Sequence, residues 1–121
     1  MLKKKILIIG NLSVKKNIVE GICKDLKLNP KVIEYVSYGD ATNYNYRKLK
    51  NNNNYSDIIV GPIPHKGKYI ENFSSIVTML ENNEYPNTIR AIDSNELKLT
   101  KTSIRSALLK TTNYRLGEVI C

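Results

Sequence analysis

The 121-residue sequence predicts one α/β domain over residues 1–121, a three-layer sandwich in which helices cover both faces of a mainly parallel sheet. Short apolar runs without polar alternation, at residues 6–9 and 58–60, indicate strands buried on both faces. Segments with helical spacing of apolar residues lie between such runs. Because strands and helices alternate along the chain, right-handed crossovers are expected to join parallel strands.

The first half of the chain predicts two strands with a helix between them. Residues 4–10 form the first strand, and Asn11 or Ser13 is expected to cap the helix that follows. That helix ends at Asn29-Pro30, and residues 31–37 form the second strand. Residues 38–56 hold four tyrosines and an asparagine run. They are predicted as a polar loop with a short helix around 43–50, the tyrosines either stacking on bases or packing at the sheet edge with hydroxyls in water.

The second half predicts two more strands and two more helices. The third strand covers 57–61, a helix runs from 71 or 72 to 81, and a fourth strand covers 87–93. Leu97 and Leu99 alternate with polar residues, which predicts a short extra extended piece. Thr100 or Thr102 caps a last helix, and residues 112–121 form either an edge strand or a loose tail.

This succession predicts strand order 2-1-3-4, the arrangement of Rossmann-like and flavodoxin-like folds. In that order the loops after the first and third strands flank the point where the winding reverses, and open α/β sheets bind ligands there. Residues 10–13 and 61–68 are therefore expected to be neighbours, although they are far apart in sequence. A rigid Gly/Pro turn in the second loop carries His65, the one histidine of the chain, next to Lys66 and Lys68.

The predicted site binds a phosphate group. Lys66 and Lys68 would neutralise its charge, and hydroxyls at two helix starts would donate hydrogen bonds. The role of His65 stays open between contacting the ligand, general acid–base chemistry and a structural hydrogen bond. The candidate ligand-binding residues are Gly10, Asn11, Ser13, Gly61, Pro62, His65, Lys66, Lys68, Ser74, Ser75, Thr100, Lys101 and Ser103.

Several familiar sites lack the residues that they need. The first loop matches neither the glycine pattern of dinucleotide-binding domains nor that of a phosphate loop. No Ser/His/Asp set can be assembled, so no catalytic residue is assigned. With one histidine and two separate cysteines, Cys23 and Cys121, neither a metal site nor a cofactor is expected. The sequence favours a binding domain over an enzyme.

The net charge of +8 is unevenly distributed. Residues 1–31 carry +6, residues 32–96 carry −2 and residues 97–121 carry +4. The two basic ends predict either attraction to nucleic-acid phosphates or a lysine-rich solvated surface. No apolar run approaches the ~20 residues of a membrane span. A cytoplasmic location is expected, without membrane association.

The pattern resembles a group of uncharacterised small bacterial Rossmann-like domains. Domains of this group begin with a strand that ends in Ile-Ile/Val-Gly, as residues 7–10 do. They later carry a strand of the pattern Asp-apolar-apolar that is followed closely by His, as Asp57 and His65 are arranged here. Asn11 replaces a second glycine common in that group. A weaker likeness is to Rossmann-like sensors of cyclic oligonucleotides, which place Thr/Ser and Lys/Arg at a late helix start, as residues 100–103 do.

The first functional expectation is thus a cytoplasmic ligand-binding or regulatory domain for a phosphate-containing small molecule, a nucleotide above all. Two alternatives remain from the sequence. One is a nucleic-acid-binding protein that uses its basic ends. The other is a homo-oligomeric structural or adaptor protein that pairs through an edge strand or an exposed helix.

Overall fold

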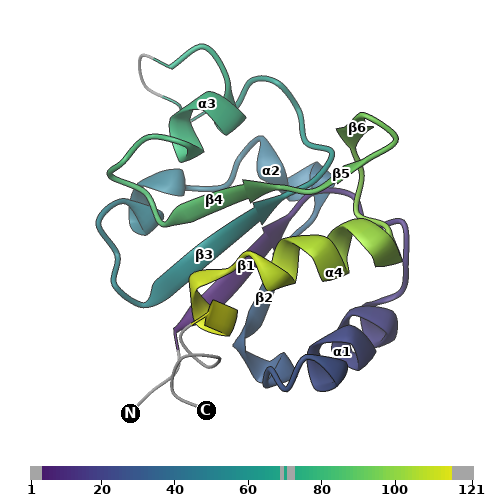
Figure 1. Cartoon of the computed structure of the whole chain (residues 1–121). Coiled ribbons are helices and arrows are strands. Elements are labelled where there is room, and N and C mark those ends of the chain that lie inside the picture. The colour runs from purple at the N-terminus through teal and green to yellow at the C-terminus, as the bar shows by residue number, and fades with distance from the viewer. Residues whose placement is uncertain (1–3, 69, 71–72, 116–121) are drawn as a thin grey trace.

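A four-stranded parallel sheet forms the centre of the computed structural model, which describes residues 4–68, 70 and 73–115. The strand order is β2-β1-β3-β4, as predicted (Figure 1). All three strand pairs are parallel, with β1 in the middle paired to both β2 and β3. The strands are β1 (Lys5–Ile9), β2 (Ile33–Val36), β3 (Tyr55–Val60) and β4 (Asn87–Arg90).

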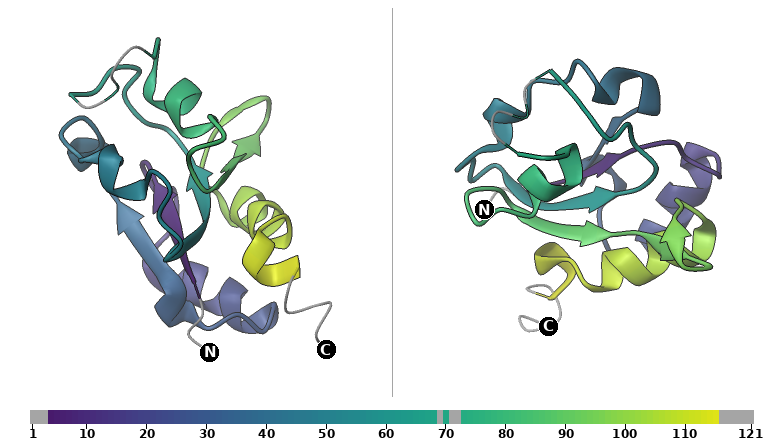
Figure 2. Two further views of the ribbon diagram at one scale, coloured as in Figure 1. Left: turned by 90° about the vertical axis from the view of Figure 1, so that its left-hand side faces the viewer. Right: turned by 90° about the horizontal axis from the view of Figure 1, so that it is seen from above.

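Helices cover both faces of this sheet. Alternate β1 residues divide between two cores: Ile6 and Ile8 pack in one, Leu7 and Ile9 in the other. The first core contains residues of α1 (Lys16–Asp25) and α4 (Lys101–Leu109). The second contains residues of α2 (Tyr38–Ala41), η2 (Tyr46–Leu49) and α3 (Ile76–Leu80). The α1–α4 layer and the α2–α3 layer therefore lie on opposite faces, which makes the three-layer sandwich expected from the sequence (Figure 2).

The first helix differs from its prediction at both ends. Its N-cap is Lys15, which makes no side-chain capping bond, so neither Asn11 nor Ser13 caps it. Lys27 adopts a left-handed φ of 61°, and the amide of Leu28 donates to the carbonyl oxygen of Cys23, which ends the helix before Pro30. Pro30 instead opens the short 3-10 helix η1 (Pro30–Val32), capped by Asn29, and β2 starts after it.

The tyrosine-rich region contains more structure than predicted. Ser37 caps α2, which was not expected, and η2 replaces the helix predicted around residues 43–50. Tyr46 is fully buried and donates its hydroxyl proton to the carbonyl oxygen of Ala41, so the expectation of a hydroxyl in water is wrong for this residue. The rings of Tyr44 and Tyr46 meet edge to face at 5.0 Å between centroids.

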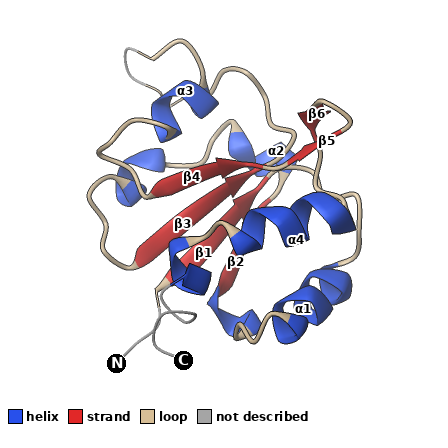
Figure 3. Cartoon of the chain, in the orientation of Figure 1, coloured by secondary structure: helices blue, strands red, loops and turns tan. Residues whose placement is uncertain are grey.

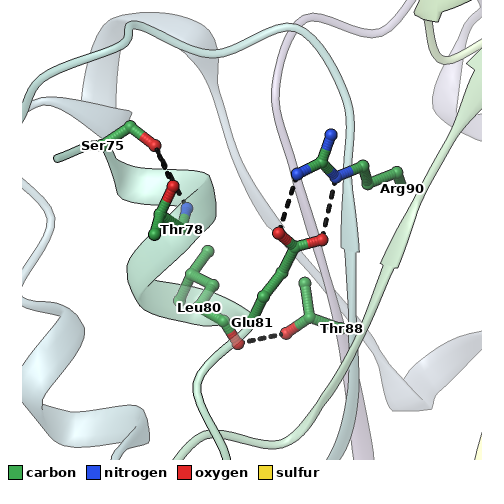
Figure 4. Close-up of polar contacts among 6 residues, drawn as sticks. All are labelled: Ser75, Thr78, Leu80, Glu81, Thr88 and Arg90. Carbon is green, nitrogen blue, oxygen red and sulfur yellow. Dashed lines mark hydrogen bonds and ion pairs between the residues drawn. The ribbon is translucent and has the colours of Figure 1, made fainter. Parts of the chain in front are cut away.

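The helix predicted from residue 71 or 72 begins only at Ile76 (Figure 4). Residues 71 and 72 lie outside the described residues. Ser75 has an extended backbone and caps α3 by accepting from the amide of Thr78 at 3.1 Å. At the other end Thr88 of β4 donates its hydroxyl proton to the carbonyl oxygen of Leu80 at 2.7 Å, and Arg90 binds Glu81 through two hydrogen bonds of 2.8 Å. The contacts of Thr88 and Arg90 therefore connect the C-terminal end of α3 to β4.

The predicted fourth strand is divided in two. Only Asn87–Arg90 pairs with β3, because Ala91 is followed by a separate antiparallel hairpin, β5 (Ile92–Asp93) and β6 (Glu96–Leu97) (Figure 3). Ser94 and Asn95 make its turn with positive φ. The predicted extra extended piece corresponds to β6 and to Leu99, which bridges Leu12.

The last part of the chain continues from α4. Thr100, and not Thr102, caps this helix. Residues 112–115 form a further helical turn, so the edge-strand alternative is wrong for them, and residues 116–121 lie outside the described part. No helix formed by the described residues is long and apolar enough to cross a membrane.

Candidate functional site

The loops after β1 and β3 meet at the carboxyl edge of the sheet. The amide of Asn11 donates to the carbonyl oxygen of Pro62 at 3.0 Å, and the amide of Gly61 donates to the carbonyl oxygen of Ile9 at 2.8 Å. The amide of Ser13 donates to the carbonyl oxygen of Leu99 at 3.0 Å, which adds the segment before α4. The predicted proximity of residues 10–13 and 61–68 is confirmed at these contacts.

Glycine at position 10 makes this close approach feasible. Gly10 has a φ of +130°, and a Cβ atom there would lie 2.7 Å from the carbonyl oxygen of Pro62. Its amide donates to the carbonyl oxygen of Val36 at the end of β2, at 2.8 Å. The β1 loop is thereby held between the ends of β2 and β3, at the edge where open α/β sheets bind ligands.

A cleft of about 320 Å³ opens beside this loop, at the carboxyl ends of β1 and β2. The loop after β1 and the start of α1 form one wall, with Gly10, Asn11, Leu12 and Lys16. The end of β2 and the start of α2 form the other, with Tyr35, Val36, Ser37, Tyr38 and Asp40. This volume lies at the small end of the range for ligand pockets.

The cleft carries opposite charges and two aromatic rings. The ammonium group of Lys16 lies 4.7 Å from the ring centroid of Tyr35, a cation–π contact. Burial, with smaller contributions from Cys23 and Glu20, raises the pKa of Tyr35 to about 12, so its hydroxyl stays protonated. Tyr38 is 49% exposed, and Asp40 lies in the first turn of α2.

The start of α1 lacks both a side-chain cap and an acidic residue in its first turn. The first amides of a helix have no partner within the helix, and their dipoles favour negative charge. Lys16, the first residue of α1, lines the cleft. An anion in the cleft would therefore meet a positive charge beside the uncapped start of a helix.

The histidine turn does not line this cleft. His65, Lys66 and Lys68 are exposed, and none is among the lining residues. The carbonyl oxygen of His65 accepts from the amide of Ile76, and the amide of Lys68 donates to the carbonyl oxygen of Thr42, so this turn is held by its backbone in the α2–α3 layer.

Two carboxylates of the β5–β6 hairpin already have partners within the protein. Asp93 accepts from the hydroxyl of Thr100 at 2.6 Å, and Glu96 pairs with Lys98 at 3.2 Å. The hydrogen bond from Thr100 and a second from Ser94 lower the pKa of Asp93. The carboxylate of Asp40, by contrast, lines the cleft.

The remaining predicted site residues are mostly capping residues. Ser75 caps α3. Thr100 and Ser103 form a reciprocal capping box at the start of α4, so both hydroxyls already have partners within the protein. Ser74 and Lys101 are exposed. Because α3 and α4 pack in different cores, their starts are parts of opposite layers.

Sequence reasoning missed the second wall of the cleft. Ser37 and Asp40 follow the end of β2, and the side chain of Ser37 accepts from the amide of Asp40 at 3.2 Å. A Ser-x-x-Asp pattern at the end of a predicted strand signals both a helix start and polar groups at the carboxyl edge. Because residues 38–56 were predicted as a polar loop, the helix start at Ser37 was not recognised.

The described residues contain no group of three or more His, Cys, Asp or Glu that could hold a metal ion. The fold and the cleft together define an α/β domain with a parallel sheet and a candidate ligand site at its carboxyl edge. A scan against protein-family models finds no match, and searches of curated proteins and of solved structures return no significant match. The resemblance to small bacterial Rossmann-like domains therefore stays a prediction.

Proposed function

We propose that this domain binds a phosphate-containing small molecule, a nucleotide, in the cleft between the β1 loop and the start of α2. The observation that carries the proposal is the cleft itself, with Lys16 and the uncapped start of α1 on one wall and Asp40 on the other. The phosphate of a nucleotide would bind at Lys16 and the start of α1, and its ribose hydroxyls would donate hydrogen bonds to Asp40. Tyr38 offers an exposed ring on which a base can stack.

This assignment keeps Gly10 and Asn11 from the sequence-based site and omits the histidine turn. Gly10 shapes the loop through its backbone, and Asn11 adds an exposed side chain at the cleft. The proposed role is binding without catalysis, since the cleft holds one carboxylate and no histidine or cysteine among its lining residues. Self-association stays a separate prediction that light scattering would test.

Titration calorimetry with a panel of ribonucleotides, the matching nucleosides and inorganic phosphate tests the proposal. Nucleotides should bind more tightly than nucleosides, because only they reach Lys16. Lys16→Ala should weaken nucleotide binding about tenfold or more, the loss expected for a hydrogen bond to a charged group. Asp40→Ala should weaken the binding of nucleosides and of nucleotides to the same extent.

The controls separate this cleft from other positions. Lys24→Ala removes an equal charge from the last turn of the same helix, away from the cleft, and should leave the affinity unchanged. His65→Ala tests the turn predicted from the sequence. A loss with His65→Ala and none with Lys16→Ala would move the site to that turn, and a protein that binds no member of the panel would refute the proposed function.

A further inference from the structure

The positive charge of the protein is concentrated on one face of the sheet. The segments that form the α1–α4 layer, residues 13–31 and 98–115, contain ten Lys or Arg and two Asp or Glu, a net charge of 10 − 2 = +8. The rest of the chain contains nine of each, a net charge of 9 − 9 = 0. The whole excess of positive charge in the sequence therefore belongs to a single helical layer. A lysine-rich surface that only aids solubility would be expected on both layers.

Most of these cations are exposed and unneutralised. Within the part of the chain that the structure describes, Arg105 pairs with Asp25 at 2.9 Å and Lys98 with Glu96 at 3.2 Å, and no ion pair within 4.0 Å involves the others. The exposed cations of the layer are Lys15, Lys16, Lys24, Lys27, Lys31, Lys98, Lys101, Lys110 and Arg115.

On the other layer and the strand edges, acidic residues neutralise several cations. Arg90 binds Glu81, and Lys5 binds Glu34 at 2.7 Å. The Arg105–Asp25 pair links α4 to α1, and the two helices share one core and lie side by side in one layer (Figure 1). The fold thus brings the two basic ends of the sequence together in one layer.

We propose that the α1–α4 layer binds duplex nucleic acid through its phosphate backbone. α4 has nine residues and is about 14 Å long at 1.5 Å per residue, and duplex DNA carries one charge per about 1.7 Å. Several phosphates therefore lie within reach of the layer. Single strands need aromatic rings for base stacking, and the two segments contain one aromatic residue, Tyr114. Contacts to phosphates alone carry no base sequence information.

Anionic membranes are the competing polyanion. Ile18 of α1 and Leu109 of α4 are exposed by 38% and 41%, but two separate aliphatic side chains are ordinary on a protein surface. The layer therefore offers charge without an apolar patch of the kind that inserts into lipid. This difference favours nucleic acid, and vesicles serve as a direct comparison in the test.

Fluorescence anisotropy with a labelled mixed-sequence DNA duplex of about twenty base pairs, over a range of salt concentrations, tests the proposal. The layer variant carries Lys24→Gln, Lys31→Gln and Lys110→Gln. The control variant carries Lys48→Gln, Lys66→Gln and Lys68→Gln, which remove the same charge from exposed positions outside the α1–α4 segments. Both sets leave Lys16 and the cleft intact.

The layer variant should bind on the order of tenfold more weakly, and the slope of log affinity against log salt should fall by about 0.9 for each phosphate that the variant no longer neutralises. The control variant should keep both the affinity and the slope of the unmodified protein. Equal weakening in the two variants, binding that does not respond to salt, or binding to phosphatidylserine vesicles without binding to the duplex would each overturn the proposal. Thermal denaturation of both variants confirms that they are folded.

Discussion

The main-chain amide of Asn11 donates a 3.0 Å hydrogen bond to the carbonyl oxygen of Pro62, and this bond joins the loops that follow β1 and β3. The two residues stand far apart in the sequence, but the chain returns to the same edge because β3 is the parallel neighbour of β1. The contact fixes one wall of the cleft, because Asn11 and Gly10 both line it. The proposed binding site thus depends on backbone geometry at position 10.

Gly10→Ala should destabilise the protein by about 2–4 kcal/mol. The added Cβ would lie 2.7 Å from the carbonyl oxygen of Pro62, and a φ of +130° strains any residue with a side chain. Urea denaturation measures the change. Gly21→Ala is the matched control, because nothing lies within 4 Å of a Cβ there and it stands inside α1. The control should gain about 0.5–1 kcal/mol, and an equal response of the two variants would contradict the loop geometry.

Asp57→Asn should also destabilise the fold, by about 2–4 kcal/mol. Asp57 is fully buried, and its carboxylate accepts from the side-chain amide of Asn87 at 2.9 Å and from the backbone amides of Thr112 and Asn113 at 2.7 and 3.2 Å. An asparagine would turn an NH₂ group toward one of these donors. The loss should appear in the urea midpoint without a change in the m-value.

Asp25→Asn is the control for that substitution. Asp25 has a side chain that is 66% exposed and pairs with Arg105 on the surface, so its replacement should change the free energy of unfolding by less than about 0.5 kcal/mol. If Asp57→Asn changed the free energy of unfolding as little as Asp25→Asn does, the buried carboxylate would not hold the segment after α4 in the way that its hydrogen bonds indicate.

The predictable parts of this fold are those in which the local pattern and the tertiary structure agree. The strands β1 and β3 lie in the middle of the sheet and are buried on both faces, so their uninterrupted apolar runs marked them directly. Their parallel order then brought Gly10 and Gly61 to one edge. α4 was also predictable, because Thr100 stands directly before its apolar repeat.

The errors occur where backbone geometry overrides the local pattern. The apolar spacing of residues 73–80 suggested a long helix, but Ser75 takes an extended conformation and Ile76 bonds across to His65. Pro30 is the first proline after the start of α1, yet Lys27 ends the helix earlier by entering the left-handed region, which few lysines do. The cleft residues after β2 were missed because a four-residue helix such as α2 has almost no periodic signal.

Acid should destabilise the protein partly through Glu34. Burial alone would raise the pKa of this carboxyl, but hydrogen bonds from Lys5 at 2.7 Å and Tyr55 at 2.8 Å outweigh burial and lower it below 4.5. A lowered pKa means that the folded state binds fewer protons than the unfolded state. The resulting stability is present above pH 4.5 and is lost as the pH falls through the lowered value.

Urea denaturation at about pH 6 and about pH 3.5 measures that loss. Glu34→Gln and Tyr55→Phe should each make the difference between the two pH values smaller, by less than about 1 kcal/mol because the site is partly exposed. Glu20→Gln removes an exposed carboxylate of α1 and should leave the difference nearly as it is. A pH dependence that stays the same in Glu34→Gln would show that the ion pair contributes nothing to acid sensitivity.

Cys23 should resist thiol reagents as long as the protein is folded. Its side chain is fully buried in the α1–α4 core, and burial, with a smaller contribution from Glu20, raises the pKa of the thiol from 9.0 to about 11. At about pH 8 the thiolate fraction is then about a hundred times smaller than in the unfolded chain, and the reagent also lacks access. In a Cys121→Ser background, Ellman's reagent should react with Cys23 at least about a hundredfold more slowly in buffer than in about 6 M guanidinium chloride. Rapid stoichiometric labelling of the folded protein would show that α1 opens from the sheet far more often than its packing allows.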